Sequence, residues 1–195
     1  MIKEVMRAEK EGIERMLETP ETEYEEVLQV FENCKGSKIV FMGVGKSGHI
    51  GKKLAATFAS LGIPSMFVHS TEAMHGDLGM IGKEDVAVLI SNSGNTDEVV
   101  QDVAPLKRNG VVTVAFTSGR ESRLAQACDY AIFYPKLKEA DALGLAPTVS
   151  STLTLVLGDA IACELSARKG FTRENFYAYH PNGALGAALG KELKK

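Results

Sequence analysis

KIVFMGVGKSGHIG, from Lys38 to Gly51, decides the fold because it joins a continuous apolar run to a glycine-rich turn. Residues 39–42 are all apolar, as is typical of a strand buried on both faces of a parallel sheet. The glycines at 43, 45 and 48 have no Cβ, so the backbone can turn tightly and approach a ligand closely. Lys46 and Ser47 stand where the next helix begins, and the free N–H groups of a helix start favour an anion. The stretch therefore predicts a strand, a loop that binds phosphate or carboxylate, and a helix.

Hydrophobic periodicity predicts the elements on either side of this stretch. We expect helices at Ile2–Leu17, Glu21–Asn33, Ile50–Leu61, Asp97–Asn109, Ser122–Ala127 and Thr148–Lys169, and further strands at Ser65–His69, Glu84–Ile90, Val111–Thr117 and Tyr130–Tyr134. After Lys169 we expect loop with a short terminal helix. The first helix is expected to cover the sheet, with packing between subunits as the alternative. Strands that alternate with helices predict a single α/β domain over residues 1–195, a three-layer sandwich around a five-stranded, parallel, flavodoxin-like sheet.

A second loop, Ser91–Thr96, follows another apolar strand and precedes a helix. Ligands of such sheets bind outside the carboxyl ends of the strands, where both loops are expected to lie. The hydroxyls of Ser91, Ser93 and Thr96 and the helix N–H groups can surround one phosphate without a metal. Capping of the next helix would explain one hydroxyl but not three. The two loops together favour one phosphorylated ligand held between them.

The spacing Gly43-x-Gly45-x-x-Gly48 also satisfies the dinucleotide-binding fingerprint. That fold needs an acidic residue at the end of the second strand, but this strand ends in Val68-His69-Ser70. A Walker A loop would need a glycine five residues before the Gly45 of Gly45-Lys46-Ser47, but position 40 is a valine, so this motif is absent. A nicotinamide-dependent dehydrogenase is therefore disfavoured.

Composition excludes several other classes of protein. The 195 residues, 45% hydrophobic and 24% charged, are ordinary for a soluble globular domain. A net charge of −3 and a pI near 5.9 argue against partners such as nucleic acid or an anionic membrane surface. No apolar run reaches membrane-spanning length, and the N-terminus is unlike a signal peptide. The three cysteines lack metal or disulfide spacing, which indicates free thiols in a reducing cytoplasm.

Five stretches between Gly43 and Gly186 resemble the sugar isomerase (SIS) domain, and more narrowly the arabinose 5-phosphate isomerases of the Kdo pathway. They are GVGKSGHIGKKLAATFASLG, EAMHGDLGMI, ISNSGNTDEV, EADALGLAPTVSSTLTLVLGDA and YHPNGALG, of which HGDLG and LGLAPT are the most diagnostic. Longer relatives continue into a pair of CBS domains, whereas this sequence stops at Lys195, so no CBS domains are expected. The family's usual HPGGALG reads HPNGALG here, and Asn182 could alter the local turn.

The resemblance implies interconversion of D-ribulose 5-phosphate and D-arabinose 5-phosphate through an enediolate, for Kdo, lipopolysaccharide or capsule biosynthesis. Glu98 would be the base that carries the proton between C1 and C2, with a favourable first-turn acid as the alternative. Lys46 would offset negative charge on the enediolate or phosphate, unless it is only an exposed loop lysine. Relatives form homotetramers with shared sites, and the same assembly is expected here.

His75 and His180 lie in family motifs and would move protons on the sugar hydroxyls, because the histidine pKa lies near working pH. Glu139 would complete the polar pocket. Ser150 and Ser151 reach the phosphate or simply cap the long helix. The expected phosphate-binding set is Gly45, Ser47, Ser91, Asn92, Ser93, Thr96, Ser150 and Ser151.

No cofactor is expected, and no metal, because the histidines and carboxylates lack tight ligand spacing. His49 and His69 are interpreted as structural. Two other functions stay open: a non-catalytic SIS module that senses a sugar phosphate, and an isomerase of a different sugar phosphate. A sensor would need an output domain.

Overall fold

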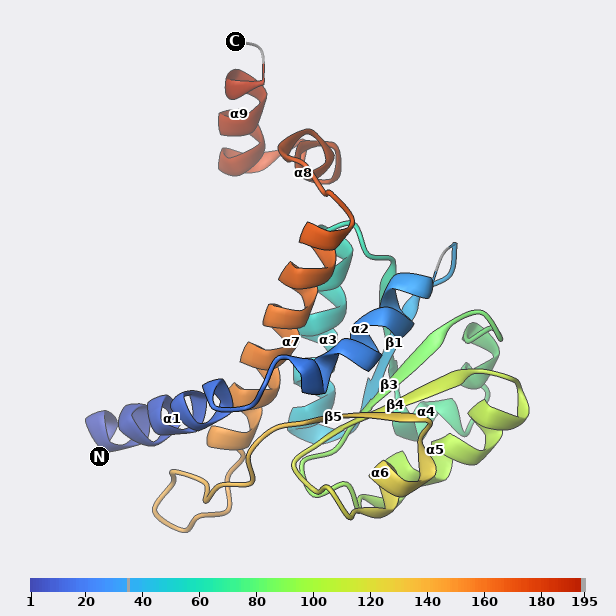
Figure 1. Cartoon of the computed structure of the whole chain (residues 1–195), viewed down its shortest axis with the longest axis vertical. Coiled ribbons are helices and arrows are strands. Elements are labelled where there is room, and N and C mark those ends of the chain that lie inside the picture. The colour runs from blue at the N-terminus through green and yellow to red at the C-terminus, as the bar shows by residue number, and fades with distance from the viewer. Residues whose placement is uncertain (35, 194–195) are drawn as a thin grey trace.

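The computed structural model describes residues 1–34 and 36–193, and its centre is a five-stranded sheet in which all paired strands are parallel (Figure 1). The strands are β1 (Ile39–Gly43), β2 (Ser65–His69), β3 (Val86–Ile90), β4 (Val112–Thr117) and β5 (Tyr130–Phe133), in the order β2-β1-β3-β4-β5. This confirms the predicted flavodoxin-like sheet. The order reverses between β1 and β3, so the loops that follow these two strands diverge and leave a crevice at their carboxyl ends.

Helices cover both faces of the sheet, as predicted (Figure 1). On one face lie α2 (Thr22–Asn33), α3 (Gly45–Ser60) and α7 (Val149–Arg168). On the other lie α4 (Ser70–Ala73), α5 (Asp97–Arg108) and α6 (Arg123–Ala127). Alternate residues of each strand point to opposite faces, so Phe41 packs under the first group and Val40 under the second.

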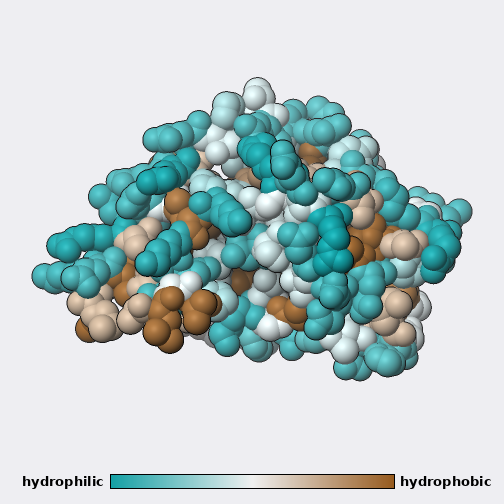
Figure 2. Space-filling view, turned by 90° about the horizontal axis from the view of Figure 1, so that it is seen from below, coloured by the Kyte–Doolittle hydropathy of each residue, from teal (hydrophilic) through white to brown (hydrophobic). Residues whose placement is uncertain are grey.

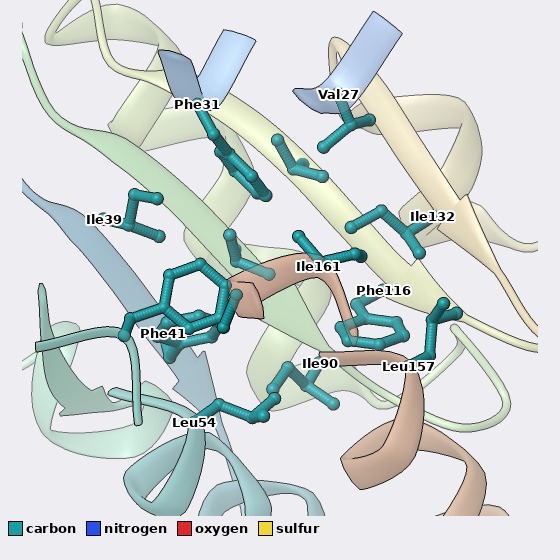
Figure 3. Close-up of a cluster of buried hydrophobic side chains, with 14 of the residues drawn as sticks. Val27, Phe31, Ile39, Phe41, Leu54, Ile90, Phe116, Ile132, Leu157 and Ile161 are labelled. Atoms are coloured by element: carbon teal, nitrogen blue, oxygen red, sulfur yellow. The ribbon is translucent and has the colours of Figure 1, made fainter. Parts of the chain in front are cut away.

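The core of the first face combines aliphatic side chains with a few phenylalanine rings (Figure 3). The rings of Phe41 and Phe58 meet edge to face with centroids 5.0 Å apart. Leu54 of α3 is fully buried and lies over Gly158 of α7, which lets the two helices approach closely. This contact aligns the starts of α3 and α7 at the same end of the molecule.

We expected the first helix, α1 (Ile2–Leu17), to cover the sheet, and this prediction is wrong. The helix packs on the outer side of α7, buries Gly12 and Met16, and points away from the body (Figure 1). Periodicity shows that a helix has an apolar stripe, but not which partner covers that stripe. The helix α7 itself is long and apolar enough to cross a membrane, contrary to the sequence-based expectation, yet 56% of its apolar window is buried inside the molecule.

Three short elements were not predicted: α4, the 3₁₀ helix η1 (Asp77–Met80) and α8 (Arg173–Tyr179). A capping box between Thr172 and Asn175 starts α8, with asparagine in place of the usual glutamate or glutamine. The terminal helix α9 (Gly183–Glu192) was expected, and its first residue, Gly183, has a φ of +76°. Both α8 and α9 stand clear of the body beyond the end of α7 (Figure 1). Most other boundaries differ from the predicted ones by one or two residues, but α3 begins at Gly45 and not at the predicted Ile50, so most of the glycine-rich stretch forms the first turn of the helix.

Candidate functional site

A cavity of about 300 Å³ opens at the carboxyl ends of the strands, where α3, α5 and α7 begin. Figure 2 views the molecule from this end, and the surface there is largely hydrophilic with scattered apolar residues. The lining residues are Val44, Lys46, Ser47, Ile50, Ile90, Asn92, Ser93, Thr96, Tyr134, Pro147, Ser150, Ser151 and Thr154. Seven of the residues predicted to bind or act on a sugar phosphate are therefore brought together in one cavity.

The starts of α3 and α5 face this cavity without side-chain caps. Their N-cap residues, Val44 and Thr96, both line it, and neither side chain accepts a hydrogen bond from its helix. No cap side chain therefore accepts a hydrogen bond from the first N–H groups of either helix. Two helix dipoles add positive potential at the same place, so the cavity favours an anion.

The glycines of the first loop have different roles from one another. Gly45 has a φ of +54°, a conformation that favours glycine, and turns the chain from β1 into α3. Gly48 was expected to let the loop approach a ligand, but a Cβ there would lie 3.0 Å from the carbonyl oxygen of Gly43. Its role is close packing of the helix on the strand. Gly45 is not in the lining, whereas the exposed Lys46 and half-buried Ser47 are.

Within the second loop the hydroxyls divide into two kinds. Ser91 is buried, and its Oγ lies 2.9 Å from Oγ1 of Thr96 and accepts a hydrogen bond from the N–H of Gly94. Ser91 therefore shapes the loop from inside and does not line the cavity. Ser93 and Thr96 do line the cavity. The Oγ of Ser93 accepts a hydrogen bond from the N–H of Asn95, so the hydroxyl proton of Ser93 remains available for another acceptor.

Tyr134 and Thr154 also line the cavity, and sequence reasoning missed both. Burial raises the pKa of Tyr134 to about 12, so the phenol is neutral and donates to Oδ1 of Asn92 at 3.2 Å. Ser118 Oγ donates to the same oxygen at 3.0 Å, so the Asn92 side chain is held from two sides. Two features of the sequence could have identified them: Tyr134 directly follows the last strand, and Thr154 carries a hydroxyl one helical turn after Ser150.

Glu139 lies behind the cavity and caps α7. Its Oε2 accepts hydrogen bonds from the N–H of Thr148 at 2.8 Å, from Oγ1 of Thr148 at 3.1 Å and from the N–H of Ser150 at 3.3 Å. Burial alone would raise the pKa of Glu139, but these hydrogen bonds and one from the Ser150 side chain outweigh it and hold the pKa below its usual value. Ser150 and Ser151, in the first turn of α7, are thereby positioned in the cavity wall.

Three other predicted residues lie outside the lining. Glu98 is exposed in the first turn of α5, two residues beyond Thr96, and His75 is exposed between α4 and η1. His180 follows α8, stacks on Phe176 with ring centroids 4.0 Å apart, and places Nδ1 3.0 Å from that residue's carbonyl oxygen. Because α7 has 20 residues and is about 30 Å long, His180 lies far from the cavity of its own chain (Figure 1).

Within the described part of the chain, His, Cys, Asp and Glu side chains form no group of three that could hold a metal ion. The expectation of metal-free chemistry stays a prediction. The cavity can bind a tetrahedral anion with hydroxyls, helix N–H groups and one lysine.

Comparison with known proteins agrees with this geometry. The KdsD arabinose 5-phosphate isomerase of Yersinia pestis is 45% identical over 187 residues, which cover 96% of this chain and 57% of the relative. That of Escherichia coli K12 is 54% identical over 156 residues, or 80% of this chain and 47% of the relative. The chain thus spans about half the length of the curated relatives it matches.

A solved structure of an Escherichia coli CFT073 protein in complex with arabinose 5-phosphate superposes with a TM-score of 0.89 and 51% identity, covering 92% of this chain and 95% of that one. The model of the SIS domain matches residues 32–163, from the end of α2 into α7. This stretch contains the whole sheet and every residue that lines the cavity, and the chain therefore belongs to the SIS domain family.

Proposed function

We propose that this chain is an arabinose 5-phosphate isomerase, which interconverts D-arabinose 5-phosphate and D-ribulose 5-phosphate. The observation that carries the proposal is the anion-binding cavity between the uncapped starts of α3 and α5, with hydroxyls from α3, from the loop before α5 and from α7 in its wall. The relative in complex with arabinose 5-phosphate, at 51% identity, supports the choice of ligand. Kdo, lipopolysaccharide or capsule synthesis would use the product, and the three free cysteines fit a cytoplasmic enzyme.

The phosphate would occupy the cavity, with Ser47, Ser93, Thr96 and Ser151 as hydroxyl donors and Lys46 as the cation. Hydrogen bonds to a charged group are the strong ones, at roughly 1.5–3 kcal/mol each. The sugar would then extend from the phosphate toward the first turn of α5.

Glu98 is the proposed base, because anchoring the phosphate beside Thr96 fixes how far the sugar carbons lie from residue 98. Its carboxylate would take the proton from C2 of the open-chain aldose, and the carbonyl electron pair would move to the C1 oxygen, giving an enediolate. After the proton of the C2 hydroxyl has passed to the C1 oxygen, the same carboxylic acid would return its proton to C1 and the C2 oxygen would become a carbonyl. Lys46 would offset the negative charge that develops on the way.

His180 is proposed to act in the site of a neighbouring subunit, and His75 to serve the sugar hydroxyls. The position of His180 beyond the far end of α7 supports this, because its own cavity lies at the other end of that helix. A homotetramer with shared sites is the proposed assembly. The exposed apolar residues Ile2, Met6 and Leu17 of α1 and Leu185 of α9 are available for such contacts.

The test is NMR of the protein with a panel of pentose and hexose phosphates in heavy water. We expect interconversion of the arabinose and ribulose 5-phosphates, with deuterium entering at C2 of recovered aldose. Glu98→Gln, which keeps the shape and removes the base, should lower turnover by about 10²–10⁴-fold and the exchange in parallel. Unphosphorylated arabinose is the matched control ligand. No exchange with any sugar phosphate would overturn the proposal in favour of a binding module, and parental exchange in the variant would remove Glu98 from the role.

A further inference from the structure

Asp102 of α5 is a carboxylate that no part of the proposed chemistry uses. It is completely buried, and both carboxylate oxygens lack a hydrogen-bond partner in the described chain. The hydroxyl of Ser70, the first residue of α4, is also completely buried and also lacks a partner among the described residues. A buried polar group without a partner is costly, so two of them facing each other between packed helices call for an explanation.

The two groups lie on opposite sides of the contact between α4 and α5. Ser70 is close enough to Asp102 to lower its pKa, but the pair does not reach hydrogen-bond geometry. Burial has the larger effect and raises the pKa of Asp102 to about 7. A neutral carboxylic acid can donate its proton to a serine oxygen, whereas an ionised one adds an uncompensated charge to the interior.

Neighbouring charges do not account for this burial-driven shift. Of the elements packed against α5, α4 carries Glu72 and α6 carries Arg123, both exposed, and β3 and β4 have no ionisable residue. Arg123 is paired with Asp97 at 2.7 Å. Glu98, one turn before Asp102 on α5, is exposed as well.

This pair joins two parts of the proposed active site. Asp102 follows Glu98 by one helical turn, and Ser70 begins the segment of residues 70–80 that contains His75, here called the His75 segment. Resting on the proposed function, we propose that Asp102 is a positioning residue: its neutral form holds Ser70 and so fixes the His75 segment against the helix of Glu98, and its ionisation releases that segment.

The sign of the pH effect follows from an acid whose pKa is raised from 3.8 to about 7 in the folded protein. The stability that its neutral form contributes is full below the unfolded pKa and is lost as the pH rises toward the folded one. Between about pH 6 and pH 8 the neutral fraction falls roughly tenfold. If only the neutral form positions the segment, kcat/KM should fall by up to that factor over this range.

The experiment compares the parent with Asp102→Asn, Asp102→Leu and the matched control Glu72→Gln. Asparagine mimics the neutral acid, so Asp102→Asn should keep high activity without the alkaline loss. Leucine fills the space without holding Ser70, so Asp102→Leu should show low activity that does not vary between pH 6 and pH 8. The control should retain the parental profile.

Amide hydrogen exchange of the His75 segment, corrected for the intrinsic effect of pH, gives a readout that does not require catalysis. Protection should fall between pH 6 and pH 8 in the parent and the control, but not in Asp102→Asn. Equal pH dependence of protection in the parent and Asp102→Asn would overturn the inference, as would an alkaline activity loss shared by both. A parent without isomerase activity would overturn the proposed function instead, and protection alone would then decide whether Asp102 holds the segment.

Discussion

A substitution at Glu139 can distinguish a residue that only caps α7 from one that takes part in the reaction. The Glu139 carboxylate accepts three hydrogen bonds at the start of α7, from two N–H groups and one hydroxyl. Glu139→Gln keeps an acceptor oxygen but removes the charge. Charge-assisted hydrogen bonds are roughly twice as strong as neutral ones, and an anion at a helix start adds about 0.3–1 kcal/mol. Because solvent screens the charge of a half-buried side chain, we expect Glu139→Gln to lower the free energy of unfolding by only about 1–2 kcal/mol.

For a chain of this length, about 1 kcal/mol corresponds to roughly 2–4 °C in Tm, so Glu139→Gln should unfold about 2–8 °C below the parent. The assay is thermal unfolding followed by circular dichroism as a function of pH. Because hydrogen bonds hold the pKa of Glu139 below its usual value, the stabilisation is full above the unfolded pKa and is lost as the pH falls through the folded one. The difference in Tm should therefore be largest near neutral pH and should close in acid.

Glu26→Gln, an exposed change on α2 with the same change of charge, is the control and should leave Tm within about 1 °C. A Glu139→Gln protein that unfolds at the parental temperature at pH 7, yet loses activity by two orders of magnitude, would refute the capping argument. It would place Glu139 in contact with the reacting sugar instead.

The cavity, the core and the position of α8 each lead to one further prediction. Ser93→Ala should weaken sugar-phosphate binding at least about tenfold with turnover largely kept, as calorimetry and steady-state kinetics would measure; unchanged affinity would place the phosphate elsewhere. Gly158→Ala should cost about 1–3 kcal/mol in urea unfolding, because its Cβ would lie 2.5 Å from a methyl carbon of the buried Leu54; an unchanged midpoint would contradict the close α3–α7 contact. Mixing inactive His180→Ala and Glu98→Gln should restore partial activity after subunit exchange, whereas inactive mixed oligomers would argue for a site within one chain.

Local sequence determined the sheet and both ligand loops. The apolar runs at residues 39–42 and 86–90 are typical of buried strands, and the helical segments between strands favour parallel pairing; the structure confirms both. Glycines and hydroxyls directly after β1 and β3 then mark the crevice where the strand order reverses. These inferences succeed because they depend on backbone geometry and side-chain period, which neighbouring residues in the chain decide.

Contacts between distant segments determined the rest, and only the tertiary structure shows them. Ser91, expected to face the ligand, bonds inside its own loop, and Tyr134 reaches Asn92 across 42 positions of sequence. Glu139 was expected from its motif to complete the pocket, but it does not line the cavity; it caps α7, which depends on how the loop before that helix folds back. Position 102 lies on the apolar face of α5 with Val99 and Leu106, so its burial could be read from the sequence, but the sequence does not show that Asp102 would lie against Ser70. Which groups meet in the interior depends on the packing of whole elements, and that packing is set by the entire chain.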